Sequence, residues 1–185
     1  MASILLVRHA ESELHGRFCG SSDPGLSPRG LQEARQLAEK LAGFPMAQIY
    51  CSPLRRAQLT VAAWAQAKTA NLTTMGALRE IGFGEWEGLA WKEIEERDPA
   101  FARLWMERFP DETPPGGEAF VTFRQRVEQA WRQICANAAQ GPNGRVAIVA
   151  HGGVLQVIQA CHTQRRFQDV AMLQTAEFVV LELDD

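Results

Sequence analysis

Two histidines in this sequence directly follow short apolar runs that are typical of buried strands. Arg8 and His9 come after the apolar residues 4–7, and His151 follows a second such run at 146–150. Runs of this length and composition predict strands buried on both faces of a parallel sheet. Because ligands in open α/β sheets bind beyond the carboxyl ends of the strands, we expect both histidines at one sheet edge. An arginine beside them would favour an anion.

A second arginine strengthens the prediction of an anion site. Residues 51–57 read Cys-Ser-Pro-Leu-Arg-Arg-Ala, and Ser52 followed by a proline is typical of a helix N-cap and first helical position. Arg56 then falls in the first helical turn, where free N–H groups and the helix dipole already favour anions. Arg55 is the weaker candidate, because the apolar stripe of this helix leaves it toward solvent. The guanidinium groups of Arg8 and Arg56 can hold a phosphoryl group while a histidine nitrogen lies near phosphorus.

A carboxylate and the second imidazole complete the candidate site. Glu80 lies in the segment 78–88, which also carries Glu85 and Glu87. A carboxylate near a phosphate dianion is repelled and tends to hold its proton, so Glu80 would serve as general acid for a leaving alkoxide. The alternative is that these glutamates are solvated loop charges, which we favour for Glu85. His151 would donate a hydrogen bond to a phosphoryl oxygen, the alternative being a core histidine before a glycine turn.

The elements that would position these residues alternate between strands and helices. Strands are predicted at 4–7, 47–50, 72–75, 146–150 and 178–183, helices at 28–43, 53–65, 91–97, 101–106, 120–138 and 154–161, and a turn at 141–144. The buried stripe of the first helix is expected at Leu31, Ala34, Ala38 and Leu41. This alternation predicts an α/β fold, a three-layer α/β/α sandwich.

Residues 81–117 are interpreted as a small helical cap inserted into this domain. Trp86, Trp91 and Trp105 occur here with several phenylalanines and prolines, and no strand is predicted. These tryptophans could stack on an aromatic leaving group, but tryptophans in a small cap are more often its own core.

Composition bounds the class of protein. The 185 residues fit one domain, 1–185, and a net charge of −3 gives no reason to expect a nucleic-acid partner. Four scattered cysteines without a CxxC pair indicate neither a disulfide framework nor a zinc site, and favour reduced thiols. We recognise no signal peptide and no membrane-spanning stretch, so we expect a cytoplasmic protein without a membrane partner.

Taken together, the motifs resemble the histidine phosphatase superfamily, in its phosphoglycerate-mutase-like branch. The resemblance spans nearly the whole chain and rests on four motifs in order, which are Arg8-His9, 52–57 with Thr60, Glu80 before 84–88, and 151–153. It implies a mixed, mostly parallel sheet flanked by helices. It also implies a transiently phosphorylated His9, phosphate held by Arg8 and Arg56, proton donation by Glu80, a pocket completed by His151, and substrate contacts from His15, Gly20 and Gly152.

Within the family, the sequence around Trp86 and Trp91 and at 115–118 resembles alpha-ribazole phosphatases of the cobalamin pathway. The resemblance implies hydrolysis of alpha-ribazole 5'-phosphate, with a broad-specificity small-molecule phosphatase or a cofactor-dependent phosphoglycerate mutase as alternatives. Several positions depart from the family pattern, among them Ala10 and His15. Ala10 stands where glycine is usual, and its extra methyl group can crowd the pocket. His15 stands where asparagine is common, and it either substitutes as a donor or is solvated.

The expected mechanism is double displacement on a small-molecule phosphomonoester. Neutral His9 attacks phosphorus, the arginines and the second histidine stabilise the phosphoryl oxygens, and Glu80 protonates the leaving alcohol. Water then attacks phosphohistidine with Glu80 as base. A backbone acceptor is expected to orient the other nitrogen of His9. No metal and no other cofactor is expected, because the arginines supply the positive charge.

Four other functions fit parts of the pattern. A cysteine phosphatase starting at Cys51 fails on register, because the residue six positions on is Ala57 rather than arginine. A metal hydrolase using His9, His151 and Glu80 would place two arginines beside a cation. A phosphomutase would need a phosphoenzyme shielded from water and a diphosphorylated primer. A non-catalytic phosphate-binding module is the fourth, and the sequence leaves a homodimer open.

Overall fold

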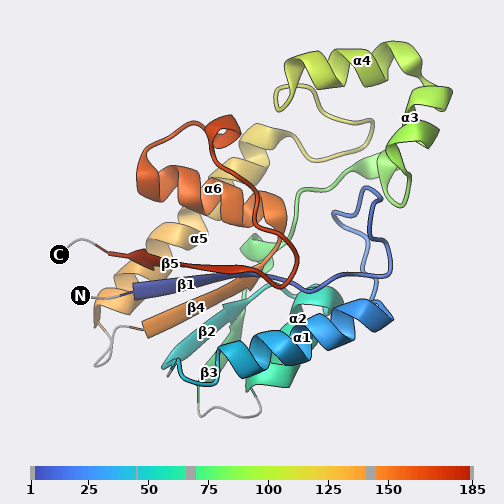
Figure 1. Cartoon of the computed structure of the whole chain (residues 1–185). Helices are drawn as coiled ribbons and strands as arrows, with labels where there is room; N and C mark the ends of the chain where they lie inside the picture. The colour runs from blue at the N-terminus through green and yellow to red at the C-terminus, as the bar shows by residue number, and fades with distance from the viewer. Residues whose placement is uncertain (1–2, 45, 66–69, 141–144, 184–185) are drawn as a thin grey trace.

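In a computed structural model, the chain forms a five-stranded sheet with helices on both faces (Figure 1). The structure describes residues 3–44, 46–65, 70–140 and 145–183. Its strands are β1 Ser3–Arg8, β2 Gln48–Cys51, β3 Asn71–Thr74, β4 Arg145–Ala150 and β5 Phe178–Glu182, and its α-helices are α1 Pro28–Lys40, α2 Arg55–Ala65, α3 Trp91–Arg97, α4 Pro99–Arg108, α5 Phe120–Gln140 and α6 Gly152–Thr163. The predicted turn at 141–144, and residues 1–2 and 184–185 of the predicted domain, lie outside the described residues.

The sheet is mixed and mostly parallel, which confirms the predicted fold class. Its strand order is β3-β2-β4-β1-β5, and only the β1–β5 pairing is antiparallel among the described strands. The parallel strands β1 and β4 are direct neighbours, with Arg8 paired to Ala150 at their carboxyl ends. His9 and His151 therefore leave the sheet side by side, at the edge where the sequence predicts them.

The alternation of side chains along β1 explains the three layers. Ile4 and Leu6 face one side of the sheet, where they join a buried cluster with residues of α5 and α6. Leu5 and Val7 face the other side and pack with residues of α1 and α2. Because both faces of β1 are covered, every apolar residue of the run is buried, as expected for a parallel strand.

The buried stripe predicted for α1 is confirmed at Ala34 and Leu41 but is wrong at Leu31. Leu31 is 46% exposed, whereas Gly30, Ala34 and Leu37 are buried. A Cβ atom at Gly30 would lie only 1.9 Å from the carbonyl oxygen of Glu11, so glycine lets the helix approach this backbone closely. This contact turns the Gly30 side of the helix inward and leaves Leu31 toward solvent.

Residues 81–117 form no strand and contain α3 and α4, with the 3-10 turn η2 (Gly84–Trp86) before them. In Figure 1 these helices lie apart from the sheet, beyond the carboxyl ends of its strands. Their apolar side chains form a cluster of their own, made of Trp86, Ile94 and Ala102 with Phe18, Phe83, Leu89, Trp91, Phe101 and Trp105. The three cap tryptophans thus pack against one another. Across the described segments, no helix has the length and apolar character needed to cross a membrane.

Candidate active site

His9 and His151 form the centre of the candidate site. Their ring centroids are 5.0 Å apart, and the backbone N–H of His9 donates to the carbonyl of Ala150 at 3.0 Å. Both side chains are almost completely buried, with 8% of His9 and 1% of His151 exposed. The two strand ends therefore bring together the imidazoles that the sequence predicts as partners.

The backbone fixes the protonation pattern of His9. Its Nδ1 lies 2.7 Å from the carbonyl oxygen of Ala10, which can only accept a hydrogen bond. Nδ1 therefore carries the proton, and Nε2 keeps the lone pair needed for attack on phosphorus. Burial, followed by the nearby arginine charges, lowers the pKa of His9 to about 3 despite this hydrogen bond. The imidazole is thus neutral at physiological pH, as attack on phosphorus would require, and Ala10 supplies the backbone acceptor expected from the sequence.

The low pKa of His9 predicts a loss of stability in acid. Between the ordinary pKa of 6.5 and the folded value of about 3, the unfolded chain binds more protons at this residue than the folded chain. Stability contributed by neutral His9 is therefore complete above 6.5 and is lost as the pH falls. At about pH 5 we expect a loss of about 2 kcal/mol in the free energy of unfolding.

Urea unfolding of the wild type and of His9→Gln at about pH 7.5 and about pH 5 measures this effect. The wild type should lose more stability on acidification than the variant, by the amount assigned to His9. An equal loss in both proteins would contradict a depressed pKa at this residue.

Ala10 connects the nucleophile to α2 through Thr60. The N–H of Ala10 donates to Oγ1 of Thr60 at 3.0 Å, and this hydroxyl donates to the carbonyl of Arg56 at 2.7 Å. The Ala10 side chain is fully buried and packs with Leu26 and Ala34. The methyl group that departs from the family pattern thus fills part of the core.

Arg56 lies in the first turn of α2, as predicted, although this helix begins two residues later than expected. Only 1% of Arg56 is exposed, whereas Arg55 is exposed. Its Nε donates to Nδ1 of His151 at 3.2 Å. Its terminal nitrogens donate to the carbonyls of Ser22 at 2.7 Å, Gly20 at 2.9 Å and Cys19 at 3.3 Å. The helix therefore delivers a buried cation to the two histidines, and backbone carbonyls orient it.

Arg8 brings the second guanidinium to the same place. Its Nη1 donates to the carbonyl of Leu173, while its buried Nε has no hydrogen-bond partner among the described residues. Burial lowers the pKa of Arg8, and the charge of Glu80 acts in the opposite direction. A Cβ atom at Gly152 would lie 3.3 Å from Cζ of Arg8 and 2.6 Å from Sδ of Met172. The glycine at the start of α6 thus allows this close packing, and its contact with substrate stays a prediction.

Ser52 contacts His151, although the sequence indicated only a helix cap at this position. It is fully buried, and its Oγ lies 2.7 Å from Nε2 of His151. Because Arg56 donates to Nδ1, His151 carries its proton on Nε2 and donates it to Ser52. For His151 to donate to a phosphoryl oxygen through Nδ1 instead, the proton must move to Nδ1 and the hydrogen bond from Arg56 must be released. The Ser52 hydroxyl serves both tautomers, since it can accept from Nε2 or donate to it.

We expect Ser52→Ala to lower kcat by about tenfold, because the alternative tautomer of His151 loses its hydrogen-bond donor. Steady-state kinetics with an aryl phosphate measures the change. Ser52→Thr keeps the hydroxyl and is the matched control. Full activity of the alanine variant would show that the hydroxyl does not act on His151.

Glu80 reaches the site from the loop after the 3-10 turn η1 (Gly76–Leu78). Its Oε2 accepts from the N–H of Gly153 at 2.9 Å, and its Oε1 accepts from the N–H of Ile81 at 3.0 Å. Burial raises the pKa of Glu80, although these hydrogen bonds and the two site arginines oppose the rise. A raised pKa is what a general acid needs. From the sequence, we expected the charge of a phosphate dianion to raise the pKa of Glu80. The structure adds burial as a second cause.

The predicted substrate contacts His15 and Gly20 lie in different surroundings. His15 is not brought to the histidine pair, since its side chain is 64% exposed and its Nδ1 lies 3.8 Å from a carboxylate oxygen of Glu11. Gly20 is buried beside Ile81, where a Cβ atom would lie 1.8 Å from the carbonyl oxygen. Its own carbonyl accepts from Arg56. Both substrate contacts stay predictions.

Glu87 is the second residue whose role the sequence did not assign. Glu85 is exposed, as expected, but the Glu87 carboxylate is half-buried and accepts hydrogen bonds from the backbone of residues 20–22. The one available signal was its place between Trp86 and Gly88 in a glycine-rich turn, which does not reveal a partner so distant in the sequence.

Two alternatives from the sequence meet obstacles in the structure. Cys51 is fully buried, and burial raises its pKa to about 12, so its thiol stays protonated. Across the described ranges, no group of three or more His, Cys, Asp or Glu side chains is arranged to hold a metal ion. Arg8 and Arg56 supply positive charge directly beside the histidines.

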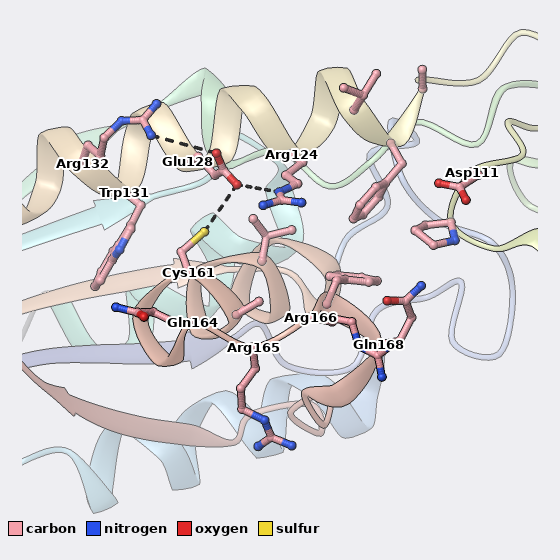
Figure 2. A pocket seen from close by; sticks show the side chains of 17 residues that line it. Asp111, Arg124, Glu128, Trp131, Arg132, Cys161, Gln164, Arg165, Arg166 and Gln168 are labelled. Atoms are coloured by element: carbon pink, nitrogen blue, oxygen red, sulfur yellow. Dashed lines mark hydrogen bonds and ion pairs between the residues drawn. The ribbon is translucent and has the colours of Figure 1, made fainter.

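A groove of about 1030 Å³ lies between α5, α6 and the 3-10 turn η3 (Phe167–Asp169), and none of the site residues lines it (Figure 2). Within it, Nε of Arg124 lies 2.6 Å from one carboxylate oxygen of Glu128, and Arg132 lies 4.0 Å from the other. Burial raises the pKa of Cys161 in this groove to about 11, so its thiol is protonated. The Cys161 thiol in this groove is therefore not an activated nucleophile, whereas the sheet edge holds the neutral imidazole of His9.

Comparison with known proteins identifies the family of this chain. Residues 4–185 match the family described as the histidine phosphatase superfamily, branch 1. The chain belongs to the histidine phosphatase superfamily. This match and the phosphatase names of its relatives identify a phosphoric monoester hydrolase.

Several relatives of this histidine phosphatase carry names of different substrates. It is 35% identical over 153 residues to phosphoserine phosphatase 1 of Hydrogenobacter thermophilus, covering 82% of this chain and 71% of the relative. It is 29% identical over 157 residues to the adenosylcobalamin/alpha-ribazole phosphatase of Escherichia coli, covering 84% and 76%. It spans only 50% of the bifunctional protein Rv2228c of Mycobacterium tuberculosis, at 32% identity over 185 residues.

The fold of this histidine phosphatase is also found in solved structures. The crystal structure of the alpha-ribazole phosphatase from Shigella flexneri superposes with a TM-score of 0.89, covering 98% of this chain and 91% of the other. The sequence identity is 23%, so this likeness concerns the fold alone.

Proposed function

We propose that this histidine phosphatase hydrolyses a small-molecule phosphomonoester through a phosphohistidine at His9. The observation that carries the proposal is the neutral imidazole whose Nδ1 is held by a backbone carbonyl, which leaves Nε2 free to attack. Arg8 and Arg56 lie close enough to His9 to lower its pKa, the ring of His151 lies 5.0 Å from it, and all three side chains can stabilise charge on the phosphoryl oxygens.

The two half-reactions balance without a further reactant besides water. The Nε2 lone pair of His9 forms a bond to phosphorus while the ester P–O bond breaks, and the departing alkoxide takes the proton of Glu80. Water then attacks phosphorus and gives its proton to Glu80, the P–N bond breaks, and the lone pair returns to Nε2. Glu80 is suited to both roles because burial raises its pKa.

Our first candidate substrate is alpha-ribazole 5'-phosphate. The support is the sequence around Trp86 and Trp91, together with the E. coli relative named as an alpha-ribazole phosphatase. Phosphoserine is the second candidate, because the higher identity of 35% is to a phosphoserine phosphatase. The cap tryptophans give no support for stacking on a leaving group, since Trp86, Trp91 and Trp105 are in contact with one another.

A substrate panel tests the proposal. Values of kcat/KM are compared for alpha-ribazole 5'-phosphate, O-phospho-L-serine, 3-phosphoglycerate and p-nitrophenyl phosphate, with and without EDTA. We expect EDTA-resistant hydrolysis, with the first compound the best substrate. A higher value for phosphoserine would select the second candidate. Isomerase activity on addition of a bisphosphorylated primer, or loss of activity in EDTA, would reject the proposed hydrolase.

A further inference from the structure

The carboxylate of Glu87 accepts hydrogen bonds from three consecutive backbone N–H groups. It accepts hydrogen bonds from the N–H groups of Gly20 at 3.1 Å, Ser21 at 2.8 Å and Ser22 at 3.1 Å, and also from the Ser21 hydroxyl at 3.1 Å. The N–H of Phe83, within the same segment as Glu87, adds a fifth donor at 2.9 Å. Burial acts to raise the pKa of Glu87, but hydrogen bonds from the Ser22 side chain and from the backbone of Phe83, Ser21 and Ser22 outweigh it, and the pKa is lowered. The residue is therefore a carboxylate with its charge directed at residues 20–22.

The opposite side of the same backbone faces the catalytic arginine. We name residues 19–22 the strap. The strap carbonyls of Cys19, Gly20 and Ser22 accept hydrogen bonds from the terminal nitrogens of Arg56. Glu87 thus lies on the N–H side of the strap, whereas Arg56 lies on its carbonyl side. An anion on the N–H side and a cation on the carbonyl side both stabilise one orientation of these peptide groups.

The strap accounts for most of the contacts that orient Arg56. Of the five N–H groups on a guanidinium, three donate to the strap and one donates to His151. A shift of the strap would therefore leave this arginine without the acceptors that hold it beside the histidines. Charge-assisted, multiple hydrogen bonds give the geometric precision that phosphoryl transfer requires.

The ends of the strap are held separately, which makes Glu87 its central anchor. Phe18 precedes the strap and packs in the aromatic cluster of the cap, with its N–H donating to the carbonyl of Leu89. Asp23 follows the strap and accepts from the N–H of Arg55 at 2.6 Å. Between these two points, three consecutive N–H groups of the strap donate to the side chain of Glu87.

We propose that Glu87 is a positioning residue for phosphoryl transfer, in which its carboxylate fixes the strap and the strap fixes Arg56. Glu87 itself touches neither substrate nor the reacting nitrogen. The inference rests on the proposed function, since it assigns Arg56 to the phosphoryl group. It also connects the cap segment that carries Glu87 to the catalytic arginine through hydrogen bonds.

A double-mutant cycle between Glu87 and Arg56 tests this route. Glu87→Gln keeps the shape but removes the charge, and should lower kcat/KM for p-nitrophenyl phosphate by about 30-fold in the wild-type background. In an Arg56→Ala background the same change should lower kcat/KM by less than about twofold, because the group it positions is gone. Inorganic phosphate is a second probe, and its dissociation constant, measured by calorimetry, should follow the same pattern. Glu85→Gln, an exposed neighbour, is the matched control and should leave kcat/KM unchanged.

The outcomes separate this inference from the proposed function. Equal fold-losses in both backgrounds, or no loss in Glu87→Gln, would overturn the positioning role while the wild type still hydrolyses phosphomonoesters. A wild type without hydrolysis would reject the proposed function, and phosphate binding would then decide the positioning role alone. If circular dichroism shows Glu87→Gln to be unfolded, Glu87→Asp replaces it, and if Arg56→Ala is unfolded, Arg56→Lys takes its place, with the same non-additivity expected.

Discussion

Replacing His9 by glutamine is expected to lower kcat for phosphomonoester hydrolysis by about 10⁴-fold or more, because the covalent route is lost. The glutamine amide nitrogen has no lone pair available for attack, although it approximates the imidazole in size. Rapid quenching of wild-type turnover with ³²P-labelled substrate should trap label on the protein. The quench is made in alkali, because phosphohistidine is acid-labile. No label should remain on His9→Gln.

Two controls make this result specific to residue 9. The thermal midpoint of His9→Gln should show a folded protein. His151→Gln should still accept label, since the role proposed for His151 is only to stabilise the phosphoryl oxygens. Surviving turnover in His9→Gln would reject the phosphohistidine mechanism. Label on a thiol would do the same and would reopen a cysteine mechanism, which the high pKa of Cys51 argues against.

The effect of Glu80→Gln should depend on the leaving group. For an alkyl phosphate the departing alkoxide needs a proton, so kcat/KM should fall by about 10³-fold without the carboxylic acid. For p-nitrophenyl phosphate the leaving group departs as a stable phenolate, and kcat/KM should fall by less than about tenfold. Steady-state kinetics with both substrates on wild type and variant gives the comparison.

The second half-reaction gives an independent readout of the same residue. Since the proposed mechanism also uses Glu80 as the base toward water, the phosphoenzyme of Glu80→Gln should accumulate. Stopped-flow traces with p-nitrophenyl phosphate should then show a burst of p-nitrophenolate close to the enzyme concentration, followed by slow turnover. Equal losses of kcat/KM for both substrates, with no burst, would show that Glu80 only shapes the pocket.

Much of the fold was predictable because its signals are local. The runs at 4–7 and 146–150 have a composition that fits a strand covered on both faces, and they become β1 and β4. The cap helix predicted at 91–97 is observed as α3 with the same bounds. Strand order was not predictable, because it depends on contacts between residues far apart. The direct pairing of β1 with β4, which places the histidine rings 5.0 Å apart, is such a feature.

The candidate site was likewise only partly predictable, since the residues of its motifs could be identified but their surroundings could not. Arg8, His9, Arg56 and His151 each stand at one end of a predicted strand or helix, so their placement at one edge of the sheet was predictable, whereas Glu80 lies in a loop. Their hydrogen-bond partners were not predictable. Ser52 was interpreted as a cap because a serine before proline is typical of a helix N-cap, and its contact with His151 is not visible in the sequence. The exposure of Leu31 in α1 was missed because it depends on the close approach of Gly30 to the backbone of Glu11.

The acceptor that orients His9 belongs to the main chain, and this has a consequence for how the enzyme can diverge. A point mutation can remove a carboxylate or a hydroxyl, but it cannot delete the carbonyl of Ala10, which lies 2.7 Å from Nδ1. The nucleophile therefore keeps its reactive tautomer while the residues around it change. Libraries that vary the cap in search of new leaving-group preferences should accordingly retain members that still form the phosphoenzyme.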